Sequence, residues 1–582
     1  MEKRLILAVF LIIIVLFAFS FINAPQPKKQ GQLEESQEKS EEKTERLLNE
    51  AVLEIAQSEE IAIKLPLYTA LLSEKGGIRS YRLNEYETRD VGVGQLEQQL
   101  QKAQQQFRQQ SMSRDADINS PVLYSIEKLR YEVSQLKESA KDKGVELISF
   151  SELYHDSLPP FLKIIDKNNT LIWSEKNNYK LVRTGSDKVQ LIQEIPGVIA
   201  VKKEFVFEPD SYLIGVKIIV ENIGSSVFEN NNFLITCGPD VGIDDGIRAY
   251  TKFEPAVFVD NQLKREKFGR GSQNKIVEKT VYGQIGWVAL QNKYFAKILI
   301  PNEDVKSAYI HKNESEEKTI GLKVAIPSLS PSQTNEFSFQ MYLGPKKLEN
   351  LHQIGRETSK IVDYGKFGNF FQIVHILKFF HRLTKNYGVA IILLTVLINL
   401  VLLPLSLKSF KSMKEMRKLQ PEMEKLRKEF KDDAQRMNKE VMELYRRHKV
   451  NPAGGCLPML LQFPIFIGLF MTLRSVIELR GAPFIFWIKD LSLPDALSLP
   501  FSLPYIGSAI NILPIIMTGV TFVQQKVSGS TGTSQPMMLM FPIFMLFIFY
   551  NFPSGLVLYF LCGNVINILA QTWINRPELK KV

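Results

Sequence analysis

The chain has 582 residues, of which 45% are hydrophobic, and a formal net charge of +10 at pH 7. These averages alone would fit a soluble protein of two or three domains. The hydrophobic residues are concentrated in a few long runs, however, and the three cysteines are too few for a disulfide framework. A purely soluble protein and a disulfide-stabilised secreted domain are therefore excluded. The sequence predicts a polytopic membrane protein with one large domain outside the membrane.

The first apolar run, residues 1–23, is predicted to be a transmembrane anchor. Lys3 and Arg4 at its start would fit either an anchor or a cleaved secretory signal peptide. The run is longer than a typical signal sequence, and no small residue stands two positions before Ala24, as a cleavage site would require. We therefore expect an anchor. The charged residues 24–55 that follow predict a flexible linker.

Residues 56–350 contain many short strand candidates separated by turns rich in Gly, Asn, Asp and Pro. The pair Gly76 and Gly77 is a hairpin signal. This pattern is typical of an antiparallel β-sandwich in a single domain. We find no paired carboxylates, catalytic triad or Gly-rich phosphate loop in it, and nothing specific calls for a sugar-binding groove. The sequence therefore does not predict an enzyme.

Residues 351–386 form a connector that ends in an amphipathic stretch. Phe371, Val374, Leu377 and Leu383 recur there at helical spacing, with charged residues between them. The stretch is too polar to cross a membrane, so we expect a helix lying along the outer membrane–water interface. The alternative is a helix packed beneath the β domain.

Five further apolar runs predict transmembrane helices. With the polar segments between them they give the following order: span 387–406, loop 407–450, span 456–476, outer loop 477–503, spans 504–523, 536–551 and 555–574, and tail 575–582. Lys and Arg are abundant before the first span, in the 407–450 loop and in the tail, and such residues favour the cytoplasmic side. Six spans with both termini in the cytoplasm satisfy every loop.

The 407–450 loop predicts two helices that pair as an antiparallel hairpin through apolar stripes. Asp432 and Gln435 resemble a capping box that would start the second helix. The excess of basic residues would suit anionic lipid headgroups or a ribosome surface, although a charged face is often only solvated. The candidate contact residues are Lys408, Lys411, Lys428, Lys431, Arg446 and Arg447.

Polar side chains recur inside the apolar spans, where facing lipid would be costly. Thr395 and Asn399 are four residues apart and share one helix face. The other candidates are Gln462, Thr518, Thr521, Asn564, Asn567 and Gln571. Hydrogen bonding between helices, which contributes about 0.6 kcal/mol per pair, would explain any one of them. Stripes on several helices favour a shared hydrated groove.

The motifs "GPKKLENL", "NPAGGCLPMLLQFPIF", "IELRGAPFIFWIKDLS" and "FPSGLVLYFLCGNVINILAQ" occur in this order toward the C-terminus. Together they closely resemble the YidC-type membrane protein insertases of bacteria with two membranes. The resemblance implies a bacterial inner-membrane protein with six transmembrane helices, five of them forming an insertase core. It also implies a large periplasmic β-sandwich domain and a cytoplasmic helical hairpin.

In that family a groove open to the cytoplasm accepts the polar flank of a nascent membrane protein and releases its apolar helix into the lipid. The resemblance implies that nascent membrane proteins, the ribosome, the Sec translocon and lipids are partners, with no cofactor and no nucleic-acid substrate. It places the path of the sliding substrate on Phe463, Phe466, Phe470, Met540 and Phe544. Ordinary core packing is the alternative explanation of such Met and Phe residues.

Asn399 departs from the family pattern, because most members have an arginine at this position. The surrounding Thr395 and Pro404 agree with the pattern. The groove is therefore expected to be polar but uncharged at this point. A small-solute transporter or channel with a periplasmic receptor domain is the competing interpretation. It is disfavoured because the spans show neither an inverted repeat nor a charged residue at mid-membrane.

Overall fold

The computed structural model describes the greater part of the chain between residues 59 and 575. The predicted anchor, the linker, the tail beyond residue 575 and Lys431 lie outside the described residues. The described residues are 59–86, 97, 99–105, 125–130, 133, 145–148, 159–166, 171–174, 179–229, 231–239, 241–242, 254–268, 275–313, 317–430, 433–448, 450, 457–503, 507–528 and 535–575.

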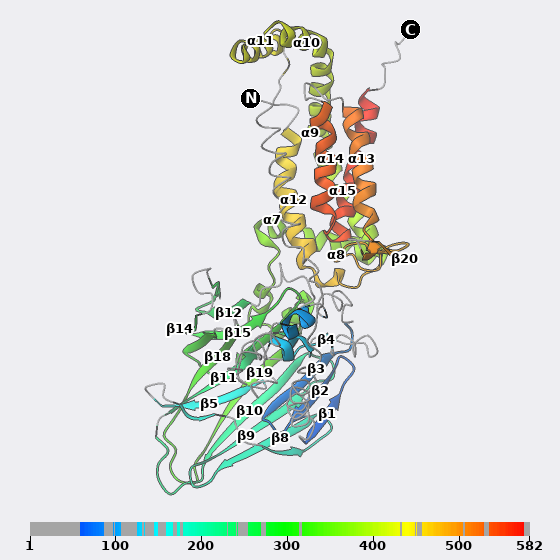
Figure 1. The fold of residues 1–582 in the computed structure, drawn as a ribbon. Coiled ribbons are helices and arrows are strands. Elements are labelled where there is room, and N and C mark those ends of the chain that lie inside the picture. Colours follow the sequence, from blue (N-terminus) through cyan, green and yellow to red (C-terminus); the bar gives the residue numbers. More distant parts are fainter. Residues whose placement is uncertain are drawn as a thin grey trace, which may run out of the picture. The chain divides into compact units, whose positions relative to one another are not determined.

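The strands before α6 form three antiparallel sheets (Figure 1). The four-stranded sheet has the order β1-β2-β3-β4, the nine-stranded sheet β13-β12-β15-β16-β19-β10-β9-β8-β7, and the six-stranded sheet β14-β17-β18-β11-β5-β6. Their bounds are β1 Glu60–Lys64, β2 Tyr68–Ser73, β3 Gly77–Leu83, β4 Val145–Glu146, β5 Phe161–Ile165, β6 Leu171–Ser174, β7 Lys180–Arg183, β8 Lys188–Ile195, β9 Ile199–Phe207, β10 Leu213–Asn222, β11 Asn231–Pro239, β12 Glu254–Val259, β13 Gln262–Arg265, β14 Val277–Tyr282, β15 Ile285–Gln291, β16 Phe295–Pro301, β17 Ser307–Lys312, β18 Lys318–Ile326 and β19 Thr334–Pro345.

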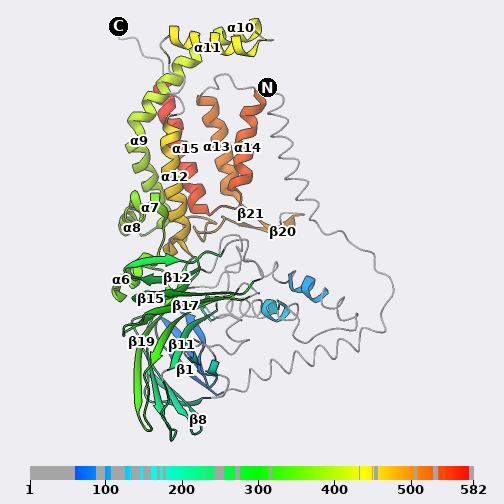
Figure 2. The ribbon, with the colours of Figure 1, turned by 90° about the vertical axis from the view of Figure 1, so that its left-hand side faces the viewer.

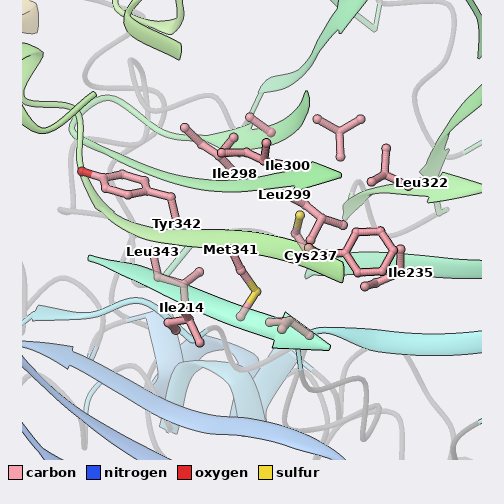
Figure 3. Packing of buried hydrophobic residues seen from close by; sticks show 14 of the residues in the cluster. Ile214, Ile235, Cys237, Ile298, Leu299, Ile300, Leu322, Met341, Tyr342 and Leu343 are labelled. Atoms are coloured by element: carbon pink, nitrogen blue, oxygen red, sulfur yellow. The ribbon is translucent and has the colours of Figure 1, made fainter. Parts of the chain in front are cut away.

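Alternation of buried and half-buried residues explains why these segments form strands. Along β9 every second side chain is buried, and β10 repeats the pattern, so that Val216 of β10 lies opposite Phe205 of β9 and Phe339 of β19. The side chains of the two large sheets meet in one core (Figure 3), where Cys237 and Leu322 of the six-stranded sheet lie among residues of β16 and β19. The predicted antiparallel β-sandwich is confirmed.

The predicted hairpin at Gly76 and Gly77 joins β2 to β3. Gly76 has a φ of 107°, a conformation that side chains rarely adopt, which explains a glycine at this point of the turn. The four-stranded sheet that contains this hairpin is an addition to the sandwich that the strand pattern alone did not separate from it.

The remainder of the described chain is mostly helical (Figures 1 and 2). α15 packs against both α9 and α13, and α13 packs against α14. The bounds are α6 Leu348–Ile354, η2 Thr358–Ile361, α7 Gly365–Phe370, α8 Ile373–Thr384, α9 Tyr387–Lys418, α10 Gln420–Glu429, α11 Ala434–Arg447, α12 Leu457–Ser475, η4 Ile477–Leu479, α13 Ile512–Ser528, α14 Gln535–Phe549 and α15 Ser554–Asn575, with a hairpin of β20 Leu497–Leu503 and β21 Gly507–Ile510 before α13.

Among the described residues, two helices are long and apolar enough to cross a membrane, α9 over Tyr387–Met416 and α15 over Ser554–Ile574. α13 and α14 are shorter apolar helices. α9 continues without a break past residue 406, where the predicted span ends, and contains Pro404. A proline removes one backbone hydrogen bond, and here the helix continues through it.

α13 begins at Ile512, later than the predicted start of the span at residue 504. The preceding residues pair as β20 and β21 instead of forming helix. Asp495 then marks the helix start, because its Oδ2 accepts the backbone N–H groups of Ile512 at 2.9 Å and Leu513 at 2.8 Å. These N–H groups have no partner within the helix, so a carboxylate at this point stabilises the new terminus.

α10 and α11 pack against each other through Leu419 and Met423 on one side and Leu444 and Tyr445 on the other. The N-cap of α11 is Asp433 and not Asp432, as the sequence had suggested. Its side chain accepts the N–H of Arg436 at 3.0 Å. The prediction was wrong by one residue because the helix begins at Ala434, which makes Asp433 the residue whose side chain reaches a free N–H of the first turn.

α8 buries Ile373, Val374 and Leu377 against the helical region, in one cluster with Ala390 and Ile391 of α9. The opposite face exposes Phe379 and Leu383. The buried face of α8 therefore packs against the helices that follow it and not against the core of the β-sandwich.

Candidate functional site

Thr395 and Asn399 lie one turn apart on α9 and both bond to their own helix. The Thr395 hydroxyl donates to the Ile391 carbonyl at 2.7 Å, and the Asn399 amide donates to the Thr395 carbonyl at 2.8 Å. Thr395 is fully buried, whereas Asn399 is half-buried. The carbonyl oxygen of the Asn399 side chain has no hydrogen bond within the described part of the chain. It can accept one from water or from another polar group.

The two side chains face α15 at Gly563. A Cβ atom placed on Gly563 would lie 3.9 Å from Nδ2 of Asn399 and 3.9 Å from Cγ2 of Thr395. A methyl group at position 563 would thus only touch these two side chains, which lie beside α15 without crowding it. The α9–α15 contact therefore includes polar side chains within the apolar part of α9.

The residue after Gly563 extends the polar contact to a third helix. Asn564 donates from Nδ2 to the Thr521 hydroxyl of α13 at 3.0 Å, and that hydroxyl donates to the Met517 carbonyl at 2.8 Å. Four of the predicted polar residues, on α9, α15 and α13, are thus brought together; we call them the polar layer. Its members are Thr395, Asn399, Thr521 and Asn564.

The other predicted groove residues lie beside or beyond this layer. Thr518 is buried one turn before Thr521 and donates to the Pro514 carbonyl at 2.8 Å. Asn567 and Gln571 continue the stripe of Asn564 along α15, Asn567 half-buried and Gln571 buried. Gln462 is half-buried on α12 and lies beside the Tyr559 hydroxyl of α15.

The sequence analysis missed two polar groups in the helical region. The hydroxyls of Tyr559 on α15 and Thr472 on α12 are buried and have no hydrogen bond of good geometry among the described residues. Thr472 packs against Gly368 of α7. Both residues occur inside apolar runs, so the same signal that identified Thr395 would have found them.

The predicted substrate path divides into two groups in the structure. Phe466 and Phe470 pack into an aromatic cluster. The ring centroids of Phe466 and Phe560 are 5.2 Å apart, and those of Phe470 and Phe552 are 5.8 Å apart. Phe463 is 60% exposed on α12 and Phe544 is 49% exposed on α14, while Met540 is half-buried.

The predicted basic contact residues are exposed wherever the structure describes them, on α9, α10 and α11. They are Lys408, Lys411, Lys428, Arg446 and Arg447. Arg447 also forms an ion pair with Glu443 at 3.1 Å. Lys414 connects the same end of α9 to α15 by donating to the Ile574 carbonyl at 3.2 Å.

Comparison with known proteins identifies the family to which this chain belongs. Residues 379–581 match the family described as 60Kd inner membrane protein, and residues 154–377 match the YidC periplasmic domain. A Membrane protein insertase YidC of Syntrophobacter fumaroxidans is 36% identical over 389 residues, which cover 66% of this chain and 70% of that protein. The chain belongs to the YidC family of membrane protein insertases.

The similarity to YidC extends over nearly the whole chain. A Membrane protein insertase YidC of Citrifermentans bemidjiense is 32% identical over 601 residues, 99% of each chain. Among solved structures, an active YidC insertase crystal structure with the first transmembrane domain resolved covers 98% of this chain and 99% of its own, at 15% identity and a TM-score of 0.34. The predicted resemblance to YidC-type insertases is confirmed by the sequence matches, and the chain is an inner membrane protein with a periplasmic-type β domain.

Proposed function

We propose that this YidC-family chain receives the polar flank of a nascent membrane protein in a hydrated groove between α9, α13 and α15. The apolar helix of the client then passes sideways into the inner membrane, with or without the Sec translocon. The observation that carries the proposal is the polar layer, in which Asn399 faces Gly563 and Asn564 bonds to Thr521. No cofactor takes part.

We expect water in the polar layer because the alternative, a polar side chain without a hydrogen bond in hydrocarbon, is costly in free energy. Asn399 satisfies one amide N–H on its own helix, and its side-chain carbonyl oxygen has no partner in the described residues. Water, or the polar flank of a client, would supply one. The side chain is neutral, so the groove would bind such a flank by hydrogen bonding instead of by charge.

The client's apolar helix would slide along α12 and α14. Phe463 and Phe544 are exposed and offer contact area, whereas Phe466 and Phe470 support that surface from the aromatic cluster behind it. Met540 adds a flexible side chain at the edge, and methionine repacks easily against different partners.

The proposed topology has six spans, with both termini and the α10–α11 hairpin in the cytoplasm and the β-sandwich in the periplasm. The distribution of Lys and Arg supports this orientation. The exposed basic residues on α9, α10 and α11 would then meet the ribosome surface or anionic headgroups of the inner leaflet.

Photocrosslinking tests the groove directly. A photoreactive residue at Asn399 or Phe463 should crosslink to ribosome-bound nascent membrane proteins. Val401 is the matched control. Positions 399 and 401 are about 200° apart around the axis of α9, so Val401 lies on the opposite face, where it is 70% exposed. Equal crosslinking from positions 399 and 401, or solute uptake into vesicles without client crosslinks, would contradict the proposal and favour a transporter.

Substitutions at Asn399 test the polar character of the groove. Asn399→Leu should reduce insertion of clients with polar tails several-fold, because the groove loses a hydrogen-bonding side chain, while Val401→Leu should have no effect. Asn399→Arg should retain insertion, since a charged side chain also keeps the groove hydrated. If Asn399→Leu inserts all clients normally, Asn399 serves only to pack α9 against α15.

A further inference from the structure

The segment between α12 and α13 carries a short apolar turn at residues 485–487. Phe486 is 87% exposed, the largest exposed fraction among the large hydrophobic side chains that the structure describes, and Ile485 is 49% exposed. Trp487 stacks on Phe486 with ring centroids 6.1 Å apart. Phe486 also has a φ of 54°, which is unfavourable for any residue with a side chain. An exposed Phe ring is unfavourable in water. The positive φ costs free energy in any surrounding.

Hydrogen bonds close the turn on itself. The Phe484 N–H donates to the Ile488 carbonyl at 3.0 Å, and the Ile488 N–H donates to the Ile485 carbonyl at 3.2 Å. Ile488 is buried in the helical core, and the ring of Phe484 packs against Gly388. The two residues that flank the turn are therefore held inward. Between them, Ile485 and Phe486 are exposed, whereas Trp487 is half-buried against the helical core.

A second set of bonds holds Trp487 in place. Its indole N–H donates to Oδ2 of Asp495 at 2.8 Å, the oxygen that also accepts the first N–H groups of α13. The turn is thus tied to a helix terminus and not left as a loose loop.

The contacts of the segment place it where two spanning helices begin. At the start of α9, the Asn386 amide donates to the Phe484 carbonyl at 3.3 Å. At the start of α15, the Ser554 N–H donates to the Leu493 carbonyl at 2.7 Å and the Gly555 N–H to the Leu491 carbonyl at 2.9 Å. α9 and α15 are the described helices long and apolar enough to cross a membrane. A segment bound to both of their first turns lies at the membrane surface.

We propose that the turn at residues 485–487 inserts into the headgroup boundary of the phospholipid leaflet and anchors the α12–α13 segment there. Exposed Phe, Trp and Leu side chains bury at this boundary when a protein segment lies along it, because their apolar surface leaves water. The exposed Lys489 beside the turn can meet lipid phosphates. Phe379 and Leu383 are further exposed apolar side chains on α8, which ends close in the chain to Asn386, the residue that bonds to Phe484.

Nitroxide accessibility measures the depth of the turn. The full chain carries Cys456→Ala and Cys562→Ala, while Cys237 stays because it is fully buried. A spin label at Phe486→Cys is studied in vesicles of phosphatidylethanolamine and phosphatidylglycerol. The matched control is a label at Tyr282→Cys on β14, a residue 75% exposed in the β domain.

The label at 486 should be several-fold more accessible to oxygen than to a water-soluble nickel complex, and the label at 282 should show the opposite order. Water-type accessibility at 486 would overturn the proposal. So would protection from both reagents, because the turn would then contact protein.

A second variant separates anchoring from folding. Phe486→Asn suits the left-handed backbone and should leave the fold intact. A label at Ile485→Cys should shift from lipid-type to water-type accessibility when Phe486→Asn is added. An unchanged accessibility would show that Phe486 is not the anchor. The measurement is independent of client insertion, so its failure would not affect the proposed groove.

Discussion

Lys378 and Glu478 form an ion pair, with Nζ of Lys378 2.6 Å from Oε1 of Glu478. The same Nζ lies 2.9 Å from Oε1 of Glu349. Lys378 belongs to α8, Glu478 to η4 after α12, and Glu349 to α6 after the last strand of the sandwich. The side chains of Lys378 and Glu478 are only 18% and 11% exposed. One lysine therefore connects three segments that are distant in the sequence.

Lys378→Met should destabilise the protein. Breaking a buried ion pair by removing one partner leaves an unpaired charge, here on Glu478, and we expect a loss of about 3 kcal/mol in the free energy of unfolding. Chemical denaturation in detergent measures it. Lys217→Met is the matched control, because the Lys217–Glu336 pair is exposed, and it should leave the denaturation midpoint unchanged. Equal effects of the two variants would contradict the structural role of Lys378.

The free energy of unfolding should depend on pH through the ion pairs of Lys378 with Glu349 and Glu478. Burial lowers the pKa of Lys378, but the charge of Glu478 and the hydrogen bonds to both carboxylates outweigh it, and the net shift is upward from 10.5. Burial raises the pKa of Glu349, but the hydrogen bond and charge of Lys378 outweigh it, and the net shift is downward from 4.5. The stabilisation is therefore complete between pH 4.5 and 10.5.

The contribution of Glu349 is lost as the pH falls through its folded pKa, and that of Lys378 is lost as the pH rises through its own. Thermal unfolding of the parent and of Lys378→Met should differ most between pH 5 and 9, taken as roughly the middle of this window. The difference should shrink at either extreme. A difference independent of pH would mean that the variant acts through packing alone.

A double-mutant cycle should detect the hydrogen bond between Asn564 and Thr521. For Asn564→Leu combined with Thr521→Val we expect a coupling of about 0.6 kcal/mol, the average for hydrogen bonds between membrane helices. Thr518→Val is the control, because among the described residues the Thr518 hydroxyl bonds only to its own helix. Coupling of Asn564 to Thr518 equal to that with Thr521 would show a nonspecific effect of polarity.

Substitution by alanine should destabilise the protein at Gly388 but not at Gly563, although both glycines lie at helix contacts. A Cβ on Gly388 would overlap the ring of Phe484, and we expect Gly388→Ala to cost about 1–3 kcal/mol. A Cβ on Gly563 meets nothing closer than 3.9 Å, so Gly563→Ala should be neutral or stabilise α15 by up to about 1 kcal/mol. Unfolding in detergent compares them. A large loss in Gly563→Ala would mean that α9 and α15 lie closer than described.

Local patterns in the sequence predicted the elements because each pattern is complete within a short window. Alternation along β9 and β10 marked the strands, Gly76 and Gly77 marked their turn, and apolar runs marked α9 and α15. Errors occurred where a contact from outside the window decided the outcome. α13 starts late because Asp495 binds its first N–H groups and the residues before it pair as a hairpin.

The membership of the polar layer could be predicted only in part. Sequence spacing placed Thr395 and Asn399 on one face of their helix, and the cost of polar groups in lipid predicted that this face meets a partner or water. It could not show that the partner is Gly563, or that Asn564 turns to Thr521 instead. Such pairings depend on how each helix is rotated about its axis and where the helices cross, which only packing determines.

The sequence by itself determined most of the segments that are helix, strand or membrane-compatible, because hydrophobic periodicity and backbone preference act over a few residues. The tertiary structure alone decided which side chains work together. Phe463 and Phe466 lie one turn apart on α12, yet one is exposed and the other packs against Phe560. The outward turn at Phe486 likewise lies within a segment whose contacts no local pattern predicts. Phe484 bonds to the start of α9, Asp495 to the start of α13, and Leu491 and Leu493 to the start of α15.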